Sequence, residues 1–390
     1  MREKARLMDE AAVKRALMRL SHEIAERNRG VENVCLVGIR RRGEPLALQI
    51  RDNIEKIEGL RVPCGSVDVR YYRDDLERLA EDYPIAAQVL EFRMLTKLNG
   101  TYVEGMLPLI DGGGKIHAHF QQTVTTTGRL SCTEPNLQNI PVRQELGRML
   151  RRVFTASDEE HVLVGADYSQ IELRIMAHLS GDPALIESFE QNRDIHQSTA
   201  ARVFDIAEED VTPLQRSRAK AVNFGVIYGI SAFGLSSDLK ISRAEAQQYI
   251  DDYFKKHPQV KEYMDRMVAE CRENGFVTTM QGRRRKIPEI HASNHMTRQL
   301  GERLAMNTPV QGSAADIMKQ AMILAYRRIN AEAPEAALIL QVHDELILDV
   351  PAGSAKKAAQ ILEESMCAAA KLKVPLVAEV NEGRDWYSIK

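Results

Sequence analysis

Residues 337–350 read "ALILQVHDELILDV", and this stretch decides what kind of sheet the chain can build. Most of it is apolar and rich in β-branched residues, which predicts a strand in the core of a sheet. In its middle, however, His343, Asp344 and Glu345 follow one another directly. Burying ionised carboxylates costs several kcal/mol unless a partner offsets the charge. The strand therefore needs a partner for its carboxylates elsewhere in the chain.

The best partner in the sequence is Asp167, in "VGADYSQIELR" (164–174), where a short apolar strand ends and a helix begins. If the two strands are neighbours, Asp167 and Asp344 share one polar cleft and raise each other's pKa. Divalent cations relieve this repulsion, and Mg²⁺ prefers such oxygen ligands. Two ions about 3.5–4 Å apart can clamp the attacking and leaving oxygens of a phosphoryl transfer. Spacing alone leaves another interpretation open, with Asp167 as a helix N-cap and Asp344 as a salt-bridged edge residue.

A second unusual pattern lies in "RSRAKAVNFGVIYG" (216–229). Arg216, Lys220, Phe224 and Tyr228 recur every four residues, which predicts that they share one face of a helix. Two cations followed by two aromatic rings suit a triphosphate at one end and a base and sugar at the other. The alternative, a helix with mixed packing contacts, remains open at this point.

Composition sets the broad class. The 390 residues are 28% charged and 44% hydrophobic, which is typical of a globular protein with two or three subdomains. Five scattered cysteines without a C-x-x-C pair favour reduced thiols in the cytoplasm over a zinc site or disulfides. The chain has no secretory signal at its start and no apolar run of about 18 residues, so we expect no membrane partner.

A net charge of −2 argues neither for nor against nucleic acid as a partner. A DNA-binding protein with this balance must concentrate its basic residues in a cleft, although a run of charges is usually just a solvated face. The candidates are Arg129, Arg143, Arg216, Arg218, Lys220 and "GRRRK" (282–286).

Along the chain, strands and helices change style near Leu76. The first part reads as strand, helix and strand, with strands over 34–39 and 66–72. Further on, 115–131 looks like a strand followed by a glycine turn, and 161–181 like a strand running into a helix. The segment 183–330 is mostly helical with breaks at Pro213, Pro258, Pro288 and Pro309, and 354–372 is a helix before a closing strand. We therefore expect an α+β fold, with an antiparallel palm-like sheet that carries a helical lobe and is preceded by a partial α/β segment.

Three spaced motifs now identify a family resemblance. "DYSQIELR" (167–174), "RSRAKAVNFGVIYG" (216–229) and "QVHDEL" (341–346) resemble motifs A, B and C of family A DNA polymerases, the DNA polymerase I type. The same family is matched by "TTTGRLSCTEPNLQNIPVR" (125–143), "DIHQSTA" (194–200) and "ERLAMNTPVQGSAADIMKQAM" (302–322). The similarity runs collinearly from about Leu76 to Lys390. It implies a remnant of the thumb at 77–107, a palm at 108–182 and 301–390, and fingers at 183–300.

The resemblance also implies an activity. We expect a template-directed DNA polymerase that is monomeric, uses two Mg²⁺ ions with Mn²⁺ as a substitute, and acts on primer-template DNA with deoxynucleoside triphosphates. Because only 77–107 matches the thumb and no exonuclease segment is recognised, the expectation includes low processivity and no proofreading. The expected location is the bacterial cytoplasm, in association with the nucleoid.

Residue roles follow from the motif matches alone. Asp167, Asp344 and the carbonyl of Tyr168 match the metal ligands, Glu345 matches an auxiliary acid, and Lys220 matches the donor of a proton to the departing pyrophosphate. The other matches to nucleotide-binding positions are Arg216 and His196 at the triphosphate, Phe224 at the sugar with discrimination against dideoxynucleotides, Glu172 as the gate against a 2′-hydroxyl, Tyr228 near the templating base, and Gln170. The matches to positions that line the duplex and the primer end, where minor-groove contacts sense pair shape, are Arg129, Asn136, Gln138, Arg143, Arg303, Asn307, Gln311 and His343.

The first 76 residues resemble a different family. "KRALMRLSHEIAERNRGVENVCLVGIRRRG" (14–43) and "DVRYYRDDL" (68–76) are similar to the start of the bifunctional pyrimidine operon attenuator/uracil phosphoribosyltransferase family, with Arg42 and Gly43 in its pyrophosphate loop. The substrate loop of that family does not follow, so we expect neither transferase nor RNA-attenuation activity. Two alternatives stay open: an inactive nucleic-acid-binding polymerase remnant, and a uracil phosphoribosyltransferase or RNA-binding regulator acting through 1–76. The origin of the fusion is also open.

Overall fold

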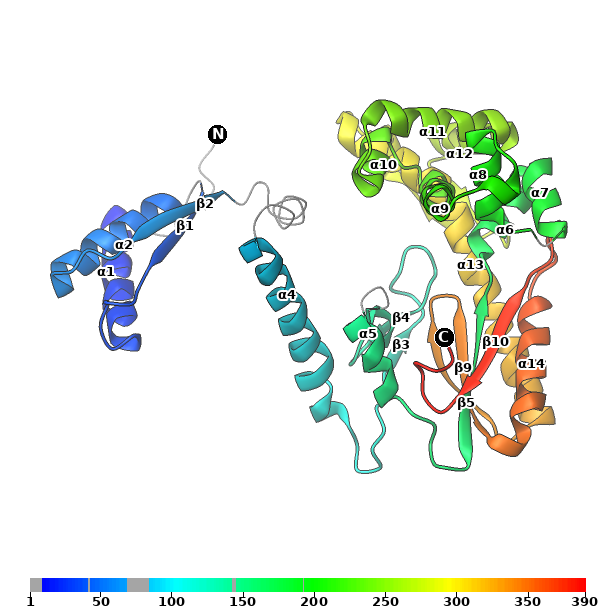
Figure 1. Cartoon of the computed structure of the whole chain (residues 1–390), viewed down its shortest axis with the longest axis horizontal. Coiled ribbons are helices and arrows are strands. Elements are labelled where there is room, and N and C mark those ends of the chain that lie inside the picture. The colour runs from blue at the N-terminus through cyan, green and yellow to red at the C-terminus, as the bar shows by residue number, and fades with distance from the viewer. Residues whose placement is uncertain (1–8, 41–42, 69–83, 142–144, 192) are drawn as a thin grey trace. The chain divides into compact units, whose positions relative to one another are not determined.

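A computed structural model describes residues 9–40, 43–68, 84–141, 145–191 and 193–390. The chain forms two compact units, Met1–Thr101 and Tyr102–Lys390 (Figure 1). Within the described residues, no helix has both the length and the apolar character needed to cross a membrane.

The first unit has a strand–helix–strand arrangement, as the sequence predicts. Its described elements are α1 (Glu10–Arg27), β1 (Leu36–Arg40), α2 (Gly43–Glu58), β2 (Cys64–Asp68) and α4 (Pro84–Leu98). The two strands pair in parallel, with Leu36 opposite Cys64. The end of the predicted second strand, 69–72, lies outside the described residues, as does Arg42. The buried core of this unit is small and centres on Ala25, Val31, Ile54 and Val62.

The second unit is built on a four-stranded antiparallel sheet. Its strands are β5 (His161–Tyr168), β8 (Ala337–Val342), β9 (Glu345–Pro351) and β10 (Ala378–Gly383), in the order β10-β5-β9-β8. Helices α13 (His295–Glu332) and α14 (Ala355–Cys367) lie beside the sheet, and one large apolar core joins them to β5 and β9 (Figure 1). This mixture of sheet and helices confirms the predicted α+β class.

Residues 337–350 form a hairpin, so the prediction of one strand over this stretch is wrong. β8 ends at Val342, β9 begins at Glu345, and these two residues face each other across the ladder. His343 and Asp344 form the turn between them. His343 has φ of 53°, in the left-handed region, where histidine is enriched several-fold among non-glycine residues. The reversal therefore places the charged residues at the end of the sheet rather than in mid-strand.

The helical lobe starts where β5 leads into α6. Its elements are α6 (Ile171–Ser180), α7 (Pro183–Glu190), α8 (Ile195–Phe204), η6 (Glu208–Asp210), α9 (Pro213–Ile227), α10 (Ala232–Leu239), α11 (Arg243–Lys256), α12 (Pro258–Asn274), β6 (Phe276–Thr278), β7 (Arg284–Lys286) and η7 (Pro288–His291). Side-chain caps explain several helix starts: Asp182 and Asp194 accept from backbone N–H groups of α7 and α8, and Thr212 forms a capping box with Gln215 at α9. The prediction of a break at Pro309 is wrong, because this proline lies inside α13.

Short elements complete the second unit. They are η3 (Leu107–Leu109), β3 (His119–Gln121), β4 (Ser131–Thr133), η4 (Leu137–Asn139), α5 (Glu145–Met149), η5 (Leu150–Val153) and η8 (Ala352–Ser354). η2 (Asn99–Glu104) begins in the first unit and ends in the second. β3 and β4 pair antiparallel and are joined by a loop that includes 125–129. The strand predicted over 115–131 is therefore wrong in extent, because a three-residue strand and a long loop take its place. The division into thumb, palm and fingers stays a prediction.

Candidate active site

The register of the sheet brings the two candidate aspartates to one end of it. Asp167, the last residue but one of β5, faces Glu345, the first residue of β9. The N–H of Tyr168 donates to the carbonyl of Asp344 over 3.0 Å. Residues that lie far apart in the sequence are therefore joined by backbone hydrogen bonds at one end of the sheet.

These carboxylates sit in an unfavourable electrostatic environment. Burial raises the pKa of Asp344 to about 6, with Glu172 and Asp167 adding to the rise and Arg129 opposing it. Burial likewise raises the pKa of Glu345, which is 1% exposed. A site that raises the pKa of two adjacent acids is one that a cation would stabilise.

Two basic residues that were not predicted from the sequence, Lys390 and Arg151, place positive charge beside these carboxylates. Lys390 Nζ lies 3.3 Å from Asp167 Oδ2 and 3.0 Å from Glu345 Oε2. Arg151, 3% exposed, has Nη1 3.9 Å from Glu345 Oε2, and its guanidinium stacks over the ring of Trp386 at 4.2 Å. Neither basic residue belongs to a recognisable motif, so no sequence signal pointed to them.

The donor set fits Mg²⁺. This ion is usually held by one or two carboxylates together with water and substrate phosphates, rather than by a cage of protein side chains. Among the described residues, no group of three or more His, Cys, Asp or Glu side chains is arranged to hold a metal. Asp167 and Asp344 provide hard oxygen ligands, and the amine of Lys390 on Asp167 shows that this end of the sheet accepts positive charge.

Helix α9 carries Arg216, Lys220 and Phe224 at four-residue spacing, as predicted, and Tyr228 is the residue that directly follows its end. Arg216 and Lys220 are exposed, and Phe224 is half-buried. Arg216 Nε donates to Asp194 Oδ2 over 2.7 Å, which ties the start of α9 to the cap of α8. Phe224 lies beside His196, with ring centroids 5.7 Å apart.

His196 is buried and uncharged at neutral pH. It is 3% exposed, and burial lowers its pKa to about 4, with Lys220 and Arg216 contributing. Asn223 Nδ2 lies 3.0 Å from His196 Nδ1, while the hydroxyl of Thr199 donates to Asn223 Oδ1 over 3.1 Å. With Nδ1 accepting from Asn223, the proton of the neutral ring is on Nε2. His196 can therefore offer a hydrogen-bond donor but not a charge.

Glu172 joins the sheet side to the helical side of the site. Its carboxylate is 5% exposed, accepts from Arg129 Nη2 over 2.7 Å and also accepts from the hydroxyl of Tyr228. Burial, together with Glu172, raises the pKa of Tyr228 above its ordinary range. Gln170, just before α6, has φ of 55°, and its Oε1 is buried without a protein partner.

Three of the other residues that are predicted to face DNA lie on helix α13. Arg303, Asn307 and Gln311 recur every four residues along this helix. Arg303 lies close to Gly229, the residue after Tyr228: a Cβ added at Gly229 would be 3.1 Å from Arg303 Cγ. Arg129, His343 and Asp344 line one small pocket.

Asn136 and Gln138 lie near the hairpin that carries His343. Asn136 Oδ1 accepts from the N–H of Gln138, and Gln138 Nε2 donates to the carbonyl of Gln341 over 3.2 Å. Arg143 lies outside the described residues. All other predicted site residues lie in the second unit.

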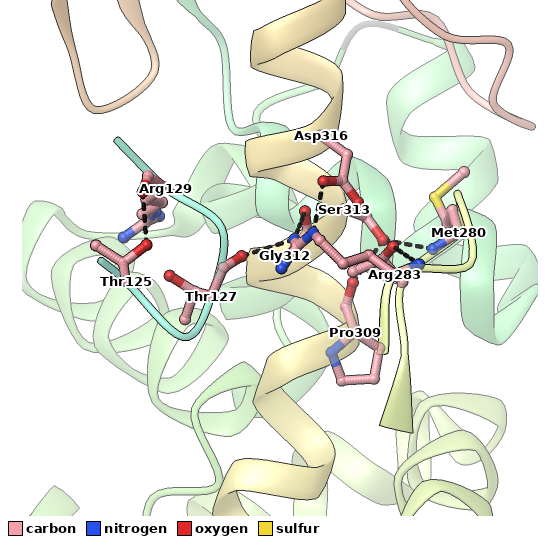
Figure 2. A network of polar contacts seen from close by, with 10 residues as sticks. Thr125, Thr127, Arg129, Met280, Arg283, Pro309, Gly312, Ser313 and Asp316 are labelled. Atoms are coloured by element: carbon pink, nitrogen blue, oxygen red, sulfur yellow. Dashed lines mark hydrogen bonds and ion pairs between the residues drawn. The ribbon is translucent and has the colours of Figure 1, made fainter. Parts of the chain in front are cut away.

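Three further basic candidates, Arg218, Arg283 and Arg285, are engaged within the protein. Arg218 Nη1 donates to the hydroxyl of Tyr249 over 3.0 Å. Within "GRRRK", Arg285 Nη1 donates to Thr308 Oγ1, and Arg283 forms the contacts shown in Figure 2. Of this cluster, Arg283 and Arg285 therefore bind other parts of the chain rather than projecting freely into a cleft.

Comparison with known proteins points to one family. The sequence profile of "DNA polymerase family A" matches residues 65–388. DNA polymerase I of Lactococcus lactis subsp. lactis is 49% identical over 337 residues, which cover 85% of this chain and 38% of that protein. The thermostable DNA polymerase I of Thermus caldophilus is 44% identical over 382 residues, 96% of this chain and 45% of that protein. The alignment with the Thermus caldophilus protein extends into the first 76 residues. The predicted resemblance of those residues to a phosphoribosyltransferase family stays a prediction.

A solved structure is also similar. The POL domain of Pol1 from M. smegmatis, in complex with DNA primer-template and dNTP, has a TM-score of 0.78 and 37% identity, covering 97% of this chain and 65% of that one. The chain spans about 38% of the length of the Lactococcus lactis polymerase and about 45% of the length of the Thermus caldophilus polymerase.

Proposed function

This chain belongs to DNA polymerase family A, and from that premise we propose that it adds deoxynucleotides to the 3′-hydroxyl of a primer under the direction of a template. Pyrophosphate is the second product. The observation that most supports the proposal is the hydrogen-bonded pairing that holds Asp344 beside the end of β5, next to Asp167. The similar M. smegmatis domain was solved in complex with DNA primer-template and dNTP, which supports the same substrates here.

At the end of the sheet, Asp167, Asp344 and the carbonyl of Tyr168 would hold two Mg²⁺ ions, with Mn²⁺ as a substitute. Such ions supply activation of the attacking hydroxyl and neutralisation of charge on the phosphates. Glu345 assists from the buried side, where Lys390 and Arg151 balance its charge.

Helix α9 binds the nucleotide. Arg216 and Lys220 contact the triphosphate, and Lys220 donates a proton to the departing pyrophosphate. The neutral ring of His196 adds a hydrogen bond from Nε2. Phe224 lies against the sugar, which fits its half-buried position next to His196. Cations at fixed points along one helix orient the triphosphate before reaction, and such positioning is a large part of phosphoryl-transfer catalysis.

Glu172 excludes a 2′-hydroxyl, and Tyr228 lies near the templating base. Gln170 belongs to the same set of nucleotide-binding residues. The residues that contact the duplex and the primer end are Arg129, Asn136, Gln138, Arg143, Arg303, Asn307, Gln311 and His343. Amide, imidazole and guanidinium groups can bond the acceptors that every base pair presents in the minor groove, so these contacts sense the shape of a pair without reading sequence.

The proposal includes a monomer of low processivity that acts on DNA in the bacterial cytoplasm, in keeping with its bacterial relatives. Within 77–107, the described residues form one α-helix, α4, followed by the short η2 and the start of η3. Phosphate contacts dominate affinity for duplex DNA, and a limited contact surface shortens each binding event. Extension in the presence of a heparin trap measures the product length per encounter, and long products would contradict this part.

Primer extension with Mg²⁺ tests the central proposal. Asp344→Ala should lower the rate by roughly a thousandfold or more, because a lost metal-holding group forfeits several kcal/mol of transition-state stabilisation. Asp349→Asn is the matched control, since Asp349 lies on the same strand, β9, and is bonded to Ser157 away from the site. Folded wild-type protein that binds primer-template without extending it would favour the inactive remnant instead.

A further inference from the structure

Arg283, which the sequence marked as a candidate for a DNA-binding cluster, turns inward from the hairpin formed by β6 and β7. Its Nε donates to Asp316 Oδ1 over 2.9 Å. Its Nη2 donates to the carbonyl of Thr127 over 2.7 Å and to the carbonyl of Gly312 over 2.9 Å (Figure 2). The side chain of Asp316 is 10% exposed and that of Arg283 is 32% exposed. One guanidinium thus joins the hairpin, helix α13 and the loop between β3 and β4.

The loop segment 125–129 is shaped around this guanidinium. Gly128 has φ of +81°, and a Cβ added there would lie 2.3 Å from Arg283 Cζ. The turn is closed by Thr125, whose hydroxyl donates to the carbonyl of Arg129 and whose carbonyl accepts from the N–H of Gly128 over 3.2 Å. Glycine is therefore required at 128 both for the backbone conformation and for the close approach of Arg283.

The helix side of the contact is equally specific. Pro309 has no N–H and so leaves the carbonyl four residues earlier without its helical partner. One turn further on, Ser313 Oγ donates to the carbonyl of Pro309 and accepts from the N–H of Met280 over 2.9 Å (Figure 2). A Cβ on Gly312 would lie 3.0 Å from Arg283 Nη2, so the hairpin packs closely against α13 here.

Two of the residues that the guanidinium binds, Thr127 and Gly312, are close in sequence to residues of the proposed site. Thr127 is two positions before Arg129, which binds Glu172 over 2.7 Å, and Gly312 directly follows Gln311. A shift of the 125–129 loop would move Arg129, and Glu172 would lose a partner for its buried carboxylate.

We propose that Arg283 is a positioning residue that fixes the 125–129 loop against α13, and that it thereby holds Arg129 and Glu172 in the arrangement that selects the sugar of the incoming nucleotide. The sugar-selection part rests on the proposed polymerase function, whereas the positioning part does not. Arginine suits the role because its planar fork donates in several fixed directions, while lysine offers a single ammonium point. Lysine cannot reproduce the three contacts together.

The first test compares Arg283→Lys with Arg285→Lys. Arg285 leaves the same hairpin and bonds the same helix through Thr308, but no contact of its side chain with the 125–129 loop is seen in the described part of the chain. Arg283→Lys should lower the preference for deoxynucleotides over ribonucleotides by roughly tenfold, measured as the ratio of kcat/KM values. Arg285→Lys should lower thermal stability comparably and leave that ratio unchanged. Equal ratios in both variants would overturn the role in sugar selection.

The second test is a double-mutant cycle. Gly128→Ala pushes the same guanidinium away, so it should lower the ratio as Arg283→Lys does. The combination should lower it no further, since both changes break one contact. Independent, multiplying losses would show that the two residues do not act together.

The third test needs no catalysis, which separates this inference from the proposed function. In hydrogen exchange without DNA, Arg283→Lys should speed exchange of the amides of Gly128 and Arg129 and leave those of β5 and β9 unchanged. If wild-type chain fails to extend primers, the proposed function is wrong, and this result still decides the positioning role. Unchanged exchange in the loop would overturn it.

Discussion

The carboxyl group of Asp344 is half-buried, and burial raises its pKa to about 6 from a usual value of 3.8. The folded protein therefore binds a proton at this group at a higher pH than the unfolded chain does. Its contribution to stability is present in full below the unfolded pKa and is lost as the pH rises through the folded pKa. At pH values above 6, the ionised form of Asp344 destabilises the metal-free protein.

Asp344→Asn should therefore stabilise the protein and abolish activity. In EDTA at about pH 8, we expect the melting temperature to rise by a few degrees, from a gain on the order of 2 kcal/mol. At about pH 4 the gain should shrink, because the carboxyl group is then mostly neutral in the folded protein. Thermal unfolding of the wild-type and Asp344→Asn proteins across this pH range measures the gain and its decrease, with Asp349→Asn as the control. A gain that does not depend on pH would contradict this account.

Glu172 provides the second prediction at the scale of single residues. Glu172→Ala removes the carboxylate that binds Arg129 and Tyr228, and should raise the relative use of ribonucleotides by about 10- to 100-fold. Glu172→Gln keeps the size of the side chain and one acceptor, so it should retain most of the exclusion. Competitive incorporation of ribonucleotides and deoxynucleotides measures the effect. Unchanged exclusion in Glu172→Ala would show that the gate lies elsewhere.

Sequence reasoning reached the site residues that belong to motifs and missed those that do not. Asp167 and Asp344 were predicted as partners because strand ends and charge repulsion leave a local signal. Arg151 and Lys390 complete the same charge cluster, yet each is an ordinary basic residue by its neighbours in sequence. Their role depends on how distant segments pack, and no periodicity or spacing encodes that.

At the scale of elements, the turn between β8 and β9 controls where Asp344 lies. His343 adopts φ of 53°, and a β-branched residue in that region is strained by about 1–2 kcal/mol. His343→Val should lower the melting temperature of the DNA-free protein by a few degrees, whereas His343→Asn should leave it nearly unchanged. Thermal unfolding without DNA excludes any effect on primer contacts. Equal stability of the two variants would show that the turn is not strained.

The same turn explains why the sequence misled about 337–350. Apolar runs flank the turn on both sides, and of its two residues only Asp344 is a common turn former, with no glycine or proline to mark a reversal. The helix starts at Asp182, Asp194 and Thr212 instead follow local rules, because a capping side chain bonds backbone N–H groups two or three residues away. Pro309 shows the opposite failure: a strong local breaker lies inside α13, in a part of the helix that the β6–β7 hairpin contacts through Met280 and Ser313.

At the scale of the whole molecule, the two units differ greatly in what they bury. The first has a two-stranded parallel sheet and the small core around Ile54, and such sheets are marginal without more packing. The second encloses the large core between the four-stranded sheet and its helices. Because stability follows buried apolar area, we expect the units to unfold separately.

Trp386 makes this difference measurable. It is the only tryptophan in the chain, is 1% exposed, and packs edge-on against Phe154 beneath Arg151. In a denaturant titration, far-UV circular dichroism should show a first, partial loss of helix while tryptophan fluorescence is unchanged, and a second loss that coincides with the fluorescence change. Primer-template with deoxynucleotide at about 100 times its Kd should raise the second transition by about 2.7 kcal/mol and leave the first in place. A single transition shared by both probes would mean that the units unfold as one.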